Sequence, residues 1–218
     1  MTLFPFSAVL TGDLIGSRTH SAAALTAAFD TLEEIVADIH ADVGGQVAMS
    51  RYRGDGWQVL LDEGKQALRS ALRIMAAFAA RPDIPQTRLG IGLGPADRPA
   101  SGQLASASGR AFEAAGDVID NMDKRRRLDI ETGAGTAITT IVALLDHQIG
   151  RWTPPQAESL VLALRENRPT QEEIAATFGV SRQAIQLRLA AVGIDVLRET
   201  MWFFESQIRD VWKADPHD

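Results

Sequence analysis

The chain has 218 residues, of which 45% are hydrophobic and 23% charged, so its composition is that of an ordinary globular protein of one large or two small domains. It contains no cysteine, which excludes disulfides and thiolate metal sites and suits a reducing compartment. The net charge is −6, so any contact with nucleic acid must be local. No signal-peptide pattern or membrane-length apolar run is present, so we expect a cytoplasmic protein with no membrane partner.

The first part of the chain predicts alternating strands and helices. A short apolar run at residues 6–10 indicates a buried strand, and apolar residues at helical spacing indicate a helix over 21–41. The elements expected next are strands over 46–52 and 56–61 joined by a hairpin turn, a helix over 65–80, a strand over 87–93, a loop over 95–102, a helix over 108–127 and a short strand from 128.

The second part of the chain predicts helices only. They are expected over residues 137–149, 155–165, 170–178, 181–192 and 195–213. Because the predicted type switches near residues 130–136, we expect an α+β protein of two domains. These are an α/β sandwich over residues 1–132 and an all-α domain over 136–218.

Residues 170–189 match the requirements of a helix-turn-helix. Thr170 can cap the first helix with Glu173 in a capping box, Gly179 suits a turn that needs a positive φ, and Ser181 can cap the second helix. With these residues at the required offsets, the segment resembles the DNA-binding motif of phage repressors and sigma factors.

If this motif binds DNA, its second helix enters the major groove. The residues expected to read base edges are Ser181, Arg182, Gln183 and Gln186. The residues expected to contact phosphates are Arg165, Arg168 and Arg188. Residues 151–192 carry a net charge of +1, which leaves −7 on the remainder of the chain. The alternative is a helical hairpin that only packs or binds another protein.

The last predicted helix carries an apolar stripe that includes Leu197, Met201 and Phe204, with Trp202 and Phe203 adding apolar area beside it. Such a helix can cover its own domain, or it can form the interface of a homodimer. A homodimer would present two recognition helices to a two-fold DNA site.

Two acidic residues follow predicted strands in the first part of the chain. Asp13 comes after the first strand, and Asp55 lies in the hairpin turn. If these strands are neighbours, both carboxylates lie at one sheet edge, where they could hold Mg²⁺ against a phosphate ligand. The backbone N–H groups of Leu14, Ile15, Gly16 and Ser17 could cradle that phosphate. The alternative is that both Asp residues only form turns.

Three short motifs add a resemblance to this pattern. They are Gly-Asp-Leu-Ile-Gly-Ser at 12–17, Gly-Asp-Gly at 54–56 and Arg-Leu-Gly-Ile-Gly-Leu-Gly at 88–94. Over about residues 5–127 the chain resembles class III nucleotidyl cyclases and, within that fold, the bacterial SatD-like proteins. This resemblance implies a ferredoxin-like sheet, with which the predicted order of strands and helices agrees. The resemblance implies that Asp13 and Asp55 occupy the positions of the metal-binding aspartates and that a nucleotide could be the ligand.

The chain departs from the cyclase pattern on the helix after the third motif. Cyclases carry an Asn and, one helical turn later, an Arg, which orient the ribose and stabilise the transition state. Glu113 and Asp117 take those positions here, and acids would oppose an anionic transition state.

We therefore expect a DNA-binding regulator whose N-terminal domain is catalytically inactive and binds a metal or phosphate ligand. That ligand would shift the arrangement of the domains. The alternatives are a metal-dependent nucleotidyl transferase or phosphohydrolase using Asp13 and Asp55, or an adaptor that binds only protein.

Overall fold

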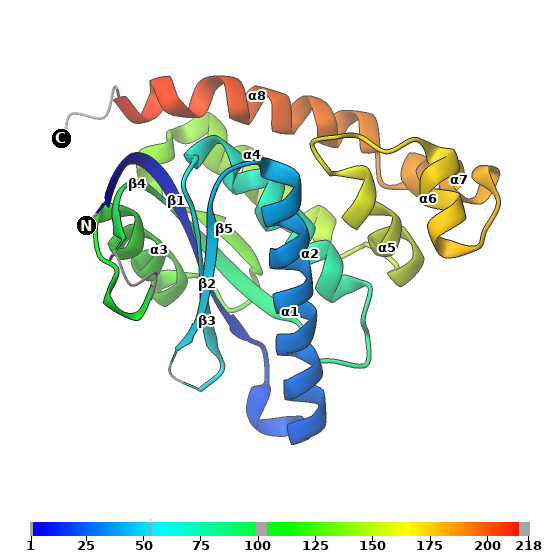
Figure 1. Ribbon diagram of the computed structural model, residues 1–218, viewed down its shortest axis with the longest axis horizontal. Helices are drawn as coiled ribbons and strands as arrows, with labels where there is room; N and C mark the ends of the chain where they lie inside the picture. The colour runs from blue at the N-terminus through cyan, green and yellow to red at the C-terminus, as the bar shows by residue number, and fades with distance from the viewer. Residues whose placement is uncertain (1, 53, 99–103, 214–218) are drawn as a thin grey trace.

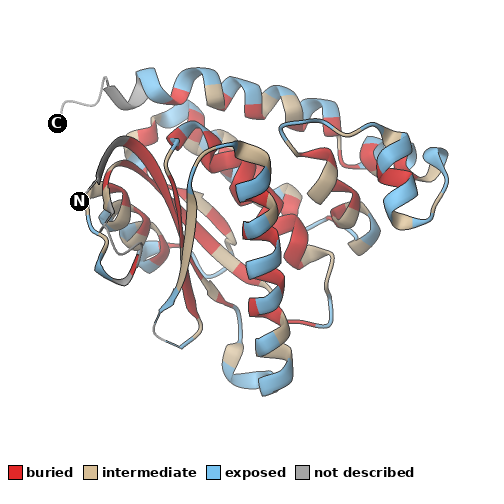
Figure 2. Ribbon diagram, in the orientation of Figure 1, coloured by how far each residue is buried: buried red, intermediate tan, exposed pale blue. Residues whose placement is uncertain are grey.

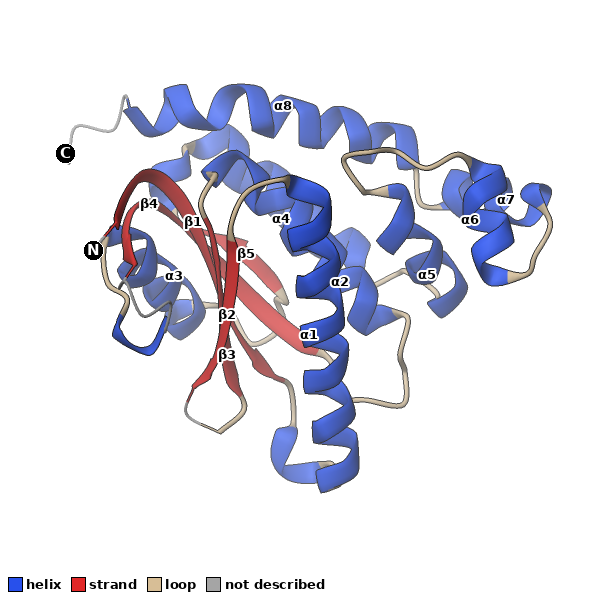
Figure 3. Cartoon of the chain, viewed as in Figure 1, coloured by secondary structure: helices blue, strands red, loops and turns tan. Residues whose placement is uncertain are grey.

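The computed structural model describes residues 2–52, 54–98 and 104–213, and its centre is a five-stranded sheet (Figure 1, Figure 3). The strands are β1 (Thr2–Leu14), β2 (Val47–Tyr52), β3 (Gly56–Leu61), β4 (Thr87–Arg98) and β5 (Leu128–Ile130). Their order across the sheet is β2-β3-β1-β4-β5, and every neighbouring pair is antiparallel except β4 and β5. A mixed α+β fold, as the sequence pattern predicted, is confirmed.

Helices cover both faces of the sheet (Figure 1). Two of them, α1 (Ala22–Val43) and α2 (Ala67–Ala79), pack on one face, and α3 (Arg110–Asn121) packs on the other. The alternation of side chains along a strand supplies both cores. In β1, Leu10 joins the core under α1 and α2, whereas Val9 joins the smaller core under α3.

The close approach of α3 to β4 depends on two glycines. A Cβ at Gly92 would lie 2.3 Å from the carbonyl oxygen of Ala111 and 2.3 Å from the backbone nitrogen of Ala115. A Cβ at Gly90 would lie 2.6 Å from the side chain of Val118. Alternate glycines on one face of β4 therefore let the backbone of α3 lie directly on the sheet.

Two strands are longer than the sequence predicted. β1 begins at Thr2 rather than at residue 6, and β4 continues to Arg98 through part of the predicted loop over 95–102. The two strands pair from Thr2 with Arg98 onward, with an irregularity between Phe4 and Ser7. Pro5 lies in this irregularity, where a residue without an N–H group is tolerated. Residues 99–102 of the predicted loop lie outside the described part of the chain.

The helix predicted over 108–127 is shorter than expected. α3 ends at Asn121, and Met122 is extended with ψ 132°. Asp123 then forms a turn, because its side chain accepts from the backbone N–H of Arg125 at 2.8 Å and its carbonyl accepts from that of Arg126 at 2.8 Å. The basic run at 124–127 therefore lies after the helix, not at its end.

The rest of the described chain is helical. The helices are α4 (Thr136–Ile149), α5 (Pro154–Ala163), α6 (Gln171–Phe178), α7 (Arg182–Ala191) and α8 (Ile194–Lys213). α6 and α7 lie at the end of the molecule away from the sheet, and α8 runs back across α4 (Figure 1). Within the described residues, no helix has both the length and the apolarity required to cross a membrane.

The two predicted domains share one hydrophobic core. Buried side chains from the sheet, from α1 and α2, and from α4 to α8 form a single cluster (Figure 2). On α2, Arg69 donates to the carbonyl of Leu164 at 3.1 Å and pairs with Glu205 of α8 at 2.6 Å. The division into residues 1–132 and 136–218 stays a prediction, but its two parts are firmly packed together through α2.

Candidate functional site

The end of β1 and the β2–β3 hairpin bring Asp13 and Asp55 into one cavity. Asp13 lies opposite Gly56 in the β1–β3 register, so Asp55 in the adjoining turn reaches the same sheet edge. The cavity, called the β1 pocket below, has a volume of about 390 Å³. Its lining residues are Asp13, Leu14, Ile15, Gly16, Ser17, Arg18, Asp55, Arg88 and Lys124.

Arg88 forms hydrogen bonds with both carboxylate oxygens of Asp13. The two residues are directly opposite in the β1–β4 register, and Arg88 donates from Nε and Nη2 to the two oxygens of Asp13, at 2.8 Å each. This hydrogen bonding raises the pKa of the Arg88 guanidinium above its ordinary value; partial burial opposes the rise, while Asp120 and Asp55 add to it. Arg88 could not be identified as a site residue from the sequence, because its position opposite Asp13 depends on the strand register.

Only some of the backbone N–H groups in the loop after β1 are free to donate to a phosphate. Leu14 is the buried last residue of β1, paired with Thr87, and the backbone N–H of Ile15 donates to the carbonyl of Gln86 at 2.7 Å. Gly16 has φ 68°, which turns the chain into the short helix Ser17–Thr19. The prediction that Ile15 donates to phosphate is therefore wrong, because its N–H already has a backbone partner.

The side chains at this edge do not fit the divalent metal that the cyclase resemblance implies. Mg²⁺ requires carboxylate oxygens that are free to coordinate at about 2.0–2.1 Å. Both oxygens of Asp13 accept from Arg88, and Ser17 donates its hydroxyl to Asp55. An ion between the carboxylates would also be repelled by the guanidinium beside it. Within the described residues, no group of three or more His, Asp or Glu side chains could hold a metal ion.

A second cavity, of about 450 Å³, lies between α3 and β5. Glu113 and Asp117, which take the positions where the cyclase resemblance implies an Asn and an Arg, are exposed on its rim. Beneath them, Glu131 is buried, accepts from the backbone N–H of Leu93 at 2.5 Å and pairs with Arg110 at 3.0 Å. Acids therefore dominate the polar groups of this cavity, which does not suit a nucleotide.

The α6–turn–α7 segment has the local geometry that its sequence predicted. Thr170 and Glu173 form a reciprocal capping box, and these hydrogen bonds hold the pKa of the Glu173 carboxyl below its ordinary value. Gly179 ends α6 with φ 63°, and Ser181 caps α7 by accepting from the N–H of Ala184 at 3.1 Å. Beneath this turn, Ile185 is fully buried.

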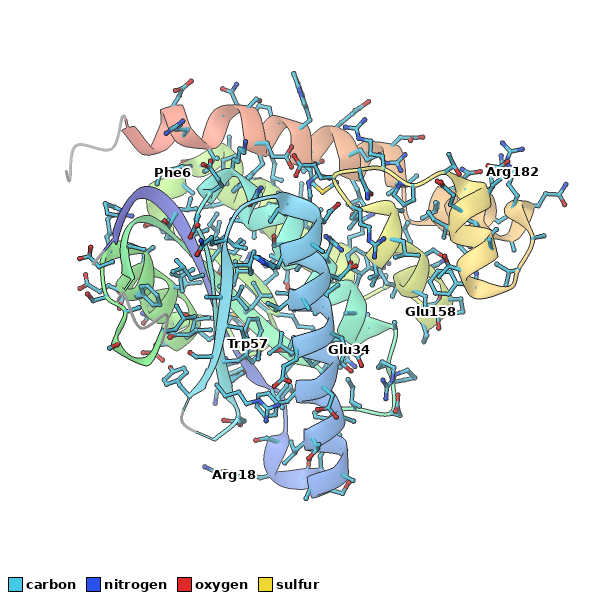
Figure 4. The ribbon with its side chains drawn as sticks, viewed as in Figure 1. Phe6, Arg18, Glu34, Trp57, Glu158 and Arg182 are labelled. Atoms are coloured by element: carbon cyan, nitrogen blue, oxygen red, sulfur yellow. The ribbon has the colours of Figure 1, made fainter. Side chains whose placement is uncertain are left out.

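The predicted base-reading residues are all exposed: Ser181, Arg182, Gln183 and Gln186. The side chain of Arg182 points away from the rest of the molecule (Figure 4). It pairs with Glu172 at 2.7 Å, and both side chains are more than 60% exposed. This edge of α7 is therefore accessible to a partner.

Two of the three predicted phosphate contacts are engaged elsewhere. Arg165 pairs with Asp38 of α1, and Arg188 is half-buried with Glu158 at 3.8 Å. Arg168 is exposed in the connection before α6. The sequence showed the charges of these residues, but not the acidic partners that folding places beside them.

No protein-family model matches the chain, and no curated protein matches it either. The solved structures that it resembles include a bacterial light-regulated adenylyl cyclase, with 15% sequence identity, a TM-score of 0.44, and coverage of 60% of this chain and 77% of that one. They also include the guanylyl cyclase Cya2, with 17% identity, a TM-score of 0.43, and coverage of 63% and 78%. Similarity at this level carries no conclusion about activity.

Proposed function

We propose that this protein is a DNA-binding transcriptional regulator that inserts α7 of a helix-turn-helix into the major groove, and that its N-terminal part is a SatD-like, catalytically inactive domain. The observation that carries the proposal is the exposed polar edge of α7, formed by Ser181, Arg182, Gln183 and Gln186. The helix lies at one end of the molecule (Figure 1). Exposed polar residues occur on any surface helix, and the feature that favours DNA here is their place at the N-terminal end of the second helix of a helix-turn-helix.

The chemistry of this edge suits base recognition. Arg pairs with guanine and Gln with adenine, each through two hydrogen bonds. Arg182 must first leave Glu172, but an exposed ion pair of this kind contributes only about 0.2–1 kcal/mol. A bidentate contact with guanine provides about 1–3 kcal/mol of discrimination, which exceeds that loss.

The charges around α7 limit how strongly it can grip the DNA backbone. Arg165 and Arg188 are committed to acidic partners, and the whole chain carries a net charge of −6. Since log K falls with a slope of about −0.9 per phosphate contacted, we expect a shallow dependence on log salt. We therefore infer that two copies of α7 bind together, as a homodimer on a two-fold site.

The alternative of a metal-dependent transferase or phosphohydrolase needs Asp13 and Asp55 to share an ion. The bidentate contact between Arg88 and Asp13 gives that function no support. An adaptor function would leave the polar edge of α7 without a nucleic-acid partner, and the experiment below separates the two.

The test is fluorescence anisotropy of the full chain with the DNA upstream of its own gene, titrated with salt. We expect binding at physiological salt that is lost in the double variant Arg182→Ala and Gln183→Ala. The control is Arg81→Ala, which removes an exposed arginine that lies outside α6, α7 and α8. If the wild-type protein binds the upstream DNA no more tightly than random DNA, the proposed function is wrong. The same holds if the α7 double variant binds the upstream DNA as tightly as the wild type.

A further inference from the structure

We propose that the β1 pocket binds a phosphate-bearing small molecule directly, without a divalent cation, and that Asp13 competes with this anion for Arg88. This inference goes beyond DNA binding and stands whether or not α7 contacts DNA. It reverses the role that the cyclase resemblance implies for Asp13, from a metal ligand to an internal substitute for the anion.

The charges of the pocket favour an anion. Three basic residues line it, Arg18, Arg88 and Lys124, against the two carboxylates of Asp13 and Asp55. Arg18 and Lys124 are exposed at its rim, and neither forms an ion pair with another residue of the described chain. Asp55 is already engaged by the hydroxyl of Ser17. This hydrogen bond does not neutralise Asp55, so three cations against two carboxylates give the lining a net charge of +1, which favours an anion.

The geometry of Arg88 explains what the anion would replace. Its Nε and Nη2 donate in parallel to two oxygens of one carboxylate, which is the arrangement that guanidinium also forms with phosphate. A phosphate group offers the same pair of oxygens with more negative charge. Asp13 is about one-third exposed, so its side chain can rotate away when a stronger acceptor enters.

The size of the pocket suits more than a single small ion. Its volume of about 390 Å³ equals that of about thirteen water molecules, at about 30 Å³ each. Arg88 lies at the sheet edge, while Arg18 follows β1 and Lys124 follows α3. The lining cations therefore come from three separate segments, which suits an extended polyphosphate better than a single phosphate group.

The direct-anion and metal-bridged alternatives predict opposite effects at Asp13. If a metal bridges the phosphate to the protein, Asp13→Asn removes a metal ligand and weakens binding. If the anion contacts Arg88 directly, the same substitution removes a like charge and frees Arg88. Binding should then become tighter by roughly tenfold, which corresponds to about one unit charge interacting through partly screened surroundings.

The experiment is isothermal titration calorimetry of the full chain with inorganic triphosphate, once with EDTA and once with excess Mg²⁺. We expect the wild-type protein to bind triphosphate in the presence of EDTA. Mg²⁺ should weaken this binding because it sequesters the anion, and Asp13→Asn should tighten it. Arg88→Gln and Lys124→Gln should each weaken it, Arg88→Gln by tenfold or more. Arg81→Gln is the matched control, because Arg81 forms a similar pair with Asp83 but does not line the pocket. Inorganic phosphate is the second probe, and its titration shows whether a single phosphate group is enough for binding.

Several outcomes would overturn the proposal. They are binding that requires Mg²⁺, loss of binding in a folded Asp13→Asn variant, and absence of triphosphate binding by wild type with EDTA. Because Lys124 is exposed and makes no ion pair in the described chain, Lys124→Gln should not disturb folding. Unchanged binding in that variant would also count against the proposal, even if the variants at Asp13 or Arg88 failed to fold.

Discussion

The buried Arg73 offers the sharpest test of how the two parts of the chain are held together. Its side chain is fully buried on α2 and pairs with Asp38 and with Asp42, at 2.9 Å from the latter. Asp38 also pairs with Arg165, and Asp42 accepts from the backbone N–H of Glu166 at 2.7 Å. This network fixes the connection between α5 and α6 to the end of α1.

We predict that Arg73→Met destabilises the protein by about 3 kcal/mol, at the low end of the range for removing one partner of a buried ion pair. The low end applies because Asp38 keeps Arg165 and Asp42 keeps its backbone donor. In addition, burial lowers the pKa of the Arg73 guanidinium, with Asp38 and Asp42 opposing that effect, so the native charge itself is costly to bury.

The assay is urea unfolding followed by circular dichroism, with Arg81→Met as the control. With an m-value of about 2–3 kcal/mol/M, the midpoint of Arg73→Met should fall by about 1 M. Arg81 pairs with Asp83 at 2.8 Å with both side chains largely exposed, so its loss should leave the midpoint unchanged. A shift for Arg73→Met no larger than that of the control would refute the reasoning.

Three further predictions concern single sites. Gly92→Ala should lower the free energy of unfolding by about 3 kcal/mol because its Cβ meets the backbone of α3, and the melting temperature should fall by about 10 °C. Its control is Gly116→Ala on α3, where a Cβ meets nothing within 4 Å, and this variant should not be destabilised. Asp123 should titrate in an NMR experiment with a pKa of about 2 rather than 3.8, because Arg125 donates to its carboxylate. The contribution of Asp123 to stability is therefore present above about pH 4 and is lost as the pH falls toward 2. Arg125→Ala should return this pKa toward 3.8. Ser181→Ala should destabilise by about 1 kcal/mol in urea unfolding through loss of the α7 cap, with Ser181→Asp retaining most of the stability.

The sequence predicted most elements of the fold because their signals are local. Helical spacing located α1 and α2, and turn residues located the hairpin and the connection between α6 and α7. The ends of β1 and β4 were missed because each strand is extended only by pairing with the other, from Thr2 with Arg98 onward. The end of α3 was missed because an Asp turn, not a Gly or Pro, stops it.

The candidate sites divide in the same way. The capping of α7 by Ser181 and the exposure of its leading edge follow from helix periodicity, so the sequence could predict them. The contact between Arg88 and Asp13 joins residues far apart in the chain, and a register shifted by one residue would place Arg88 on the opposite face of the sheet. Charge at a position can be read from a sequence, but the neutralisation of that charge by a distant partner cannot.

The arrangement of α1 limits how the β1 pocket could influence α7. Arg18 lies at the bottom of the molecule and Arg182 at its upper right (Figure 4), and α1, with 22 residues, is about 33 Å long. Since charges in physiological salt are screened over about 8 Å, a bound anion cannot act on α7 electrostatically. Any coupling must be mechanical, from the loop that precedes α1 to Asp38 and Asp42 near its end, and from there to the segment before α6. Linkage makes this measurable, because triphosphate must change the affinity for DNA by the same factor as DNA changes the affinity for triphosphate. Asp42→Asn weakens the contact between α1 and the segment before α6. If triphosphate changes the affinity for DNA by the same factor in this variant as in the wild type, this route is excluded.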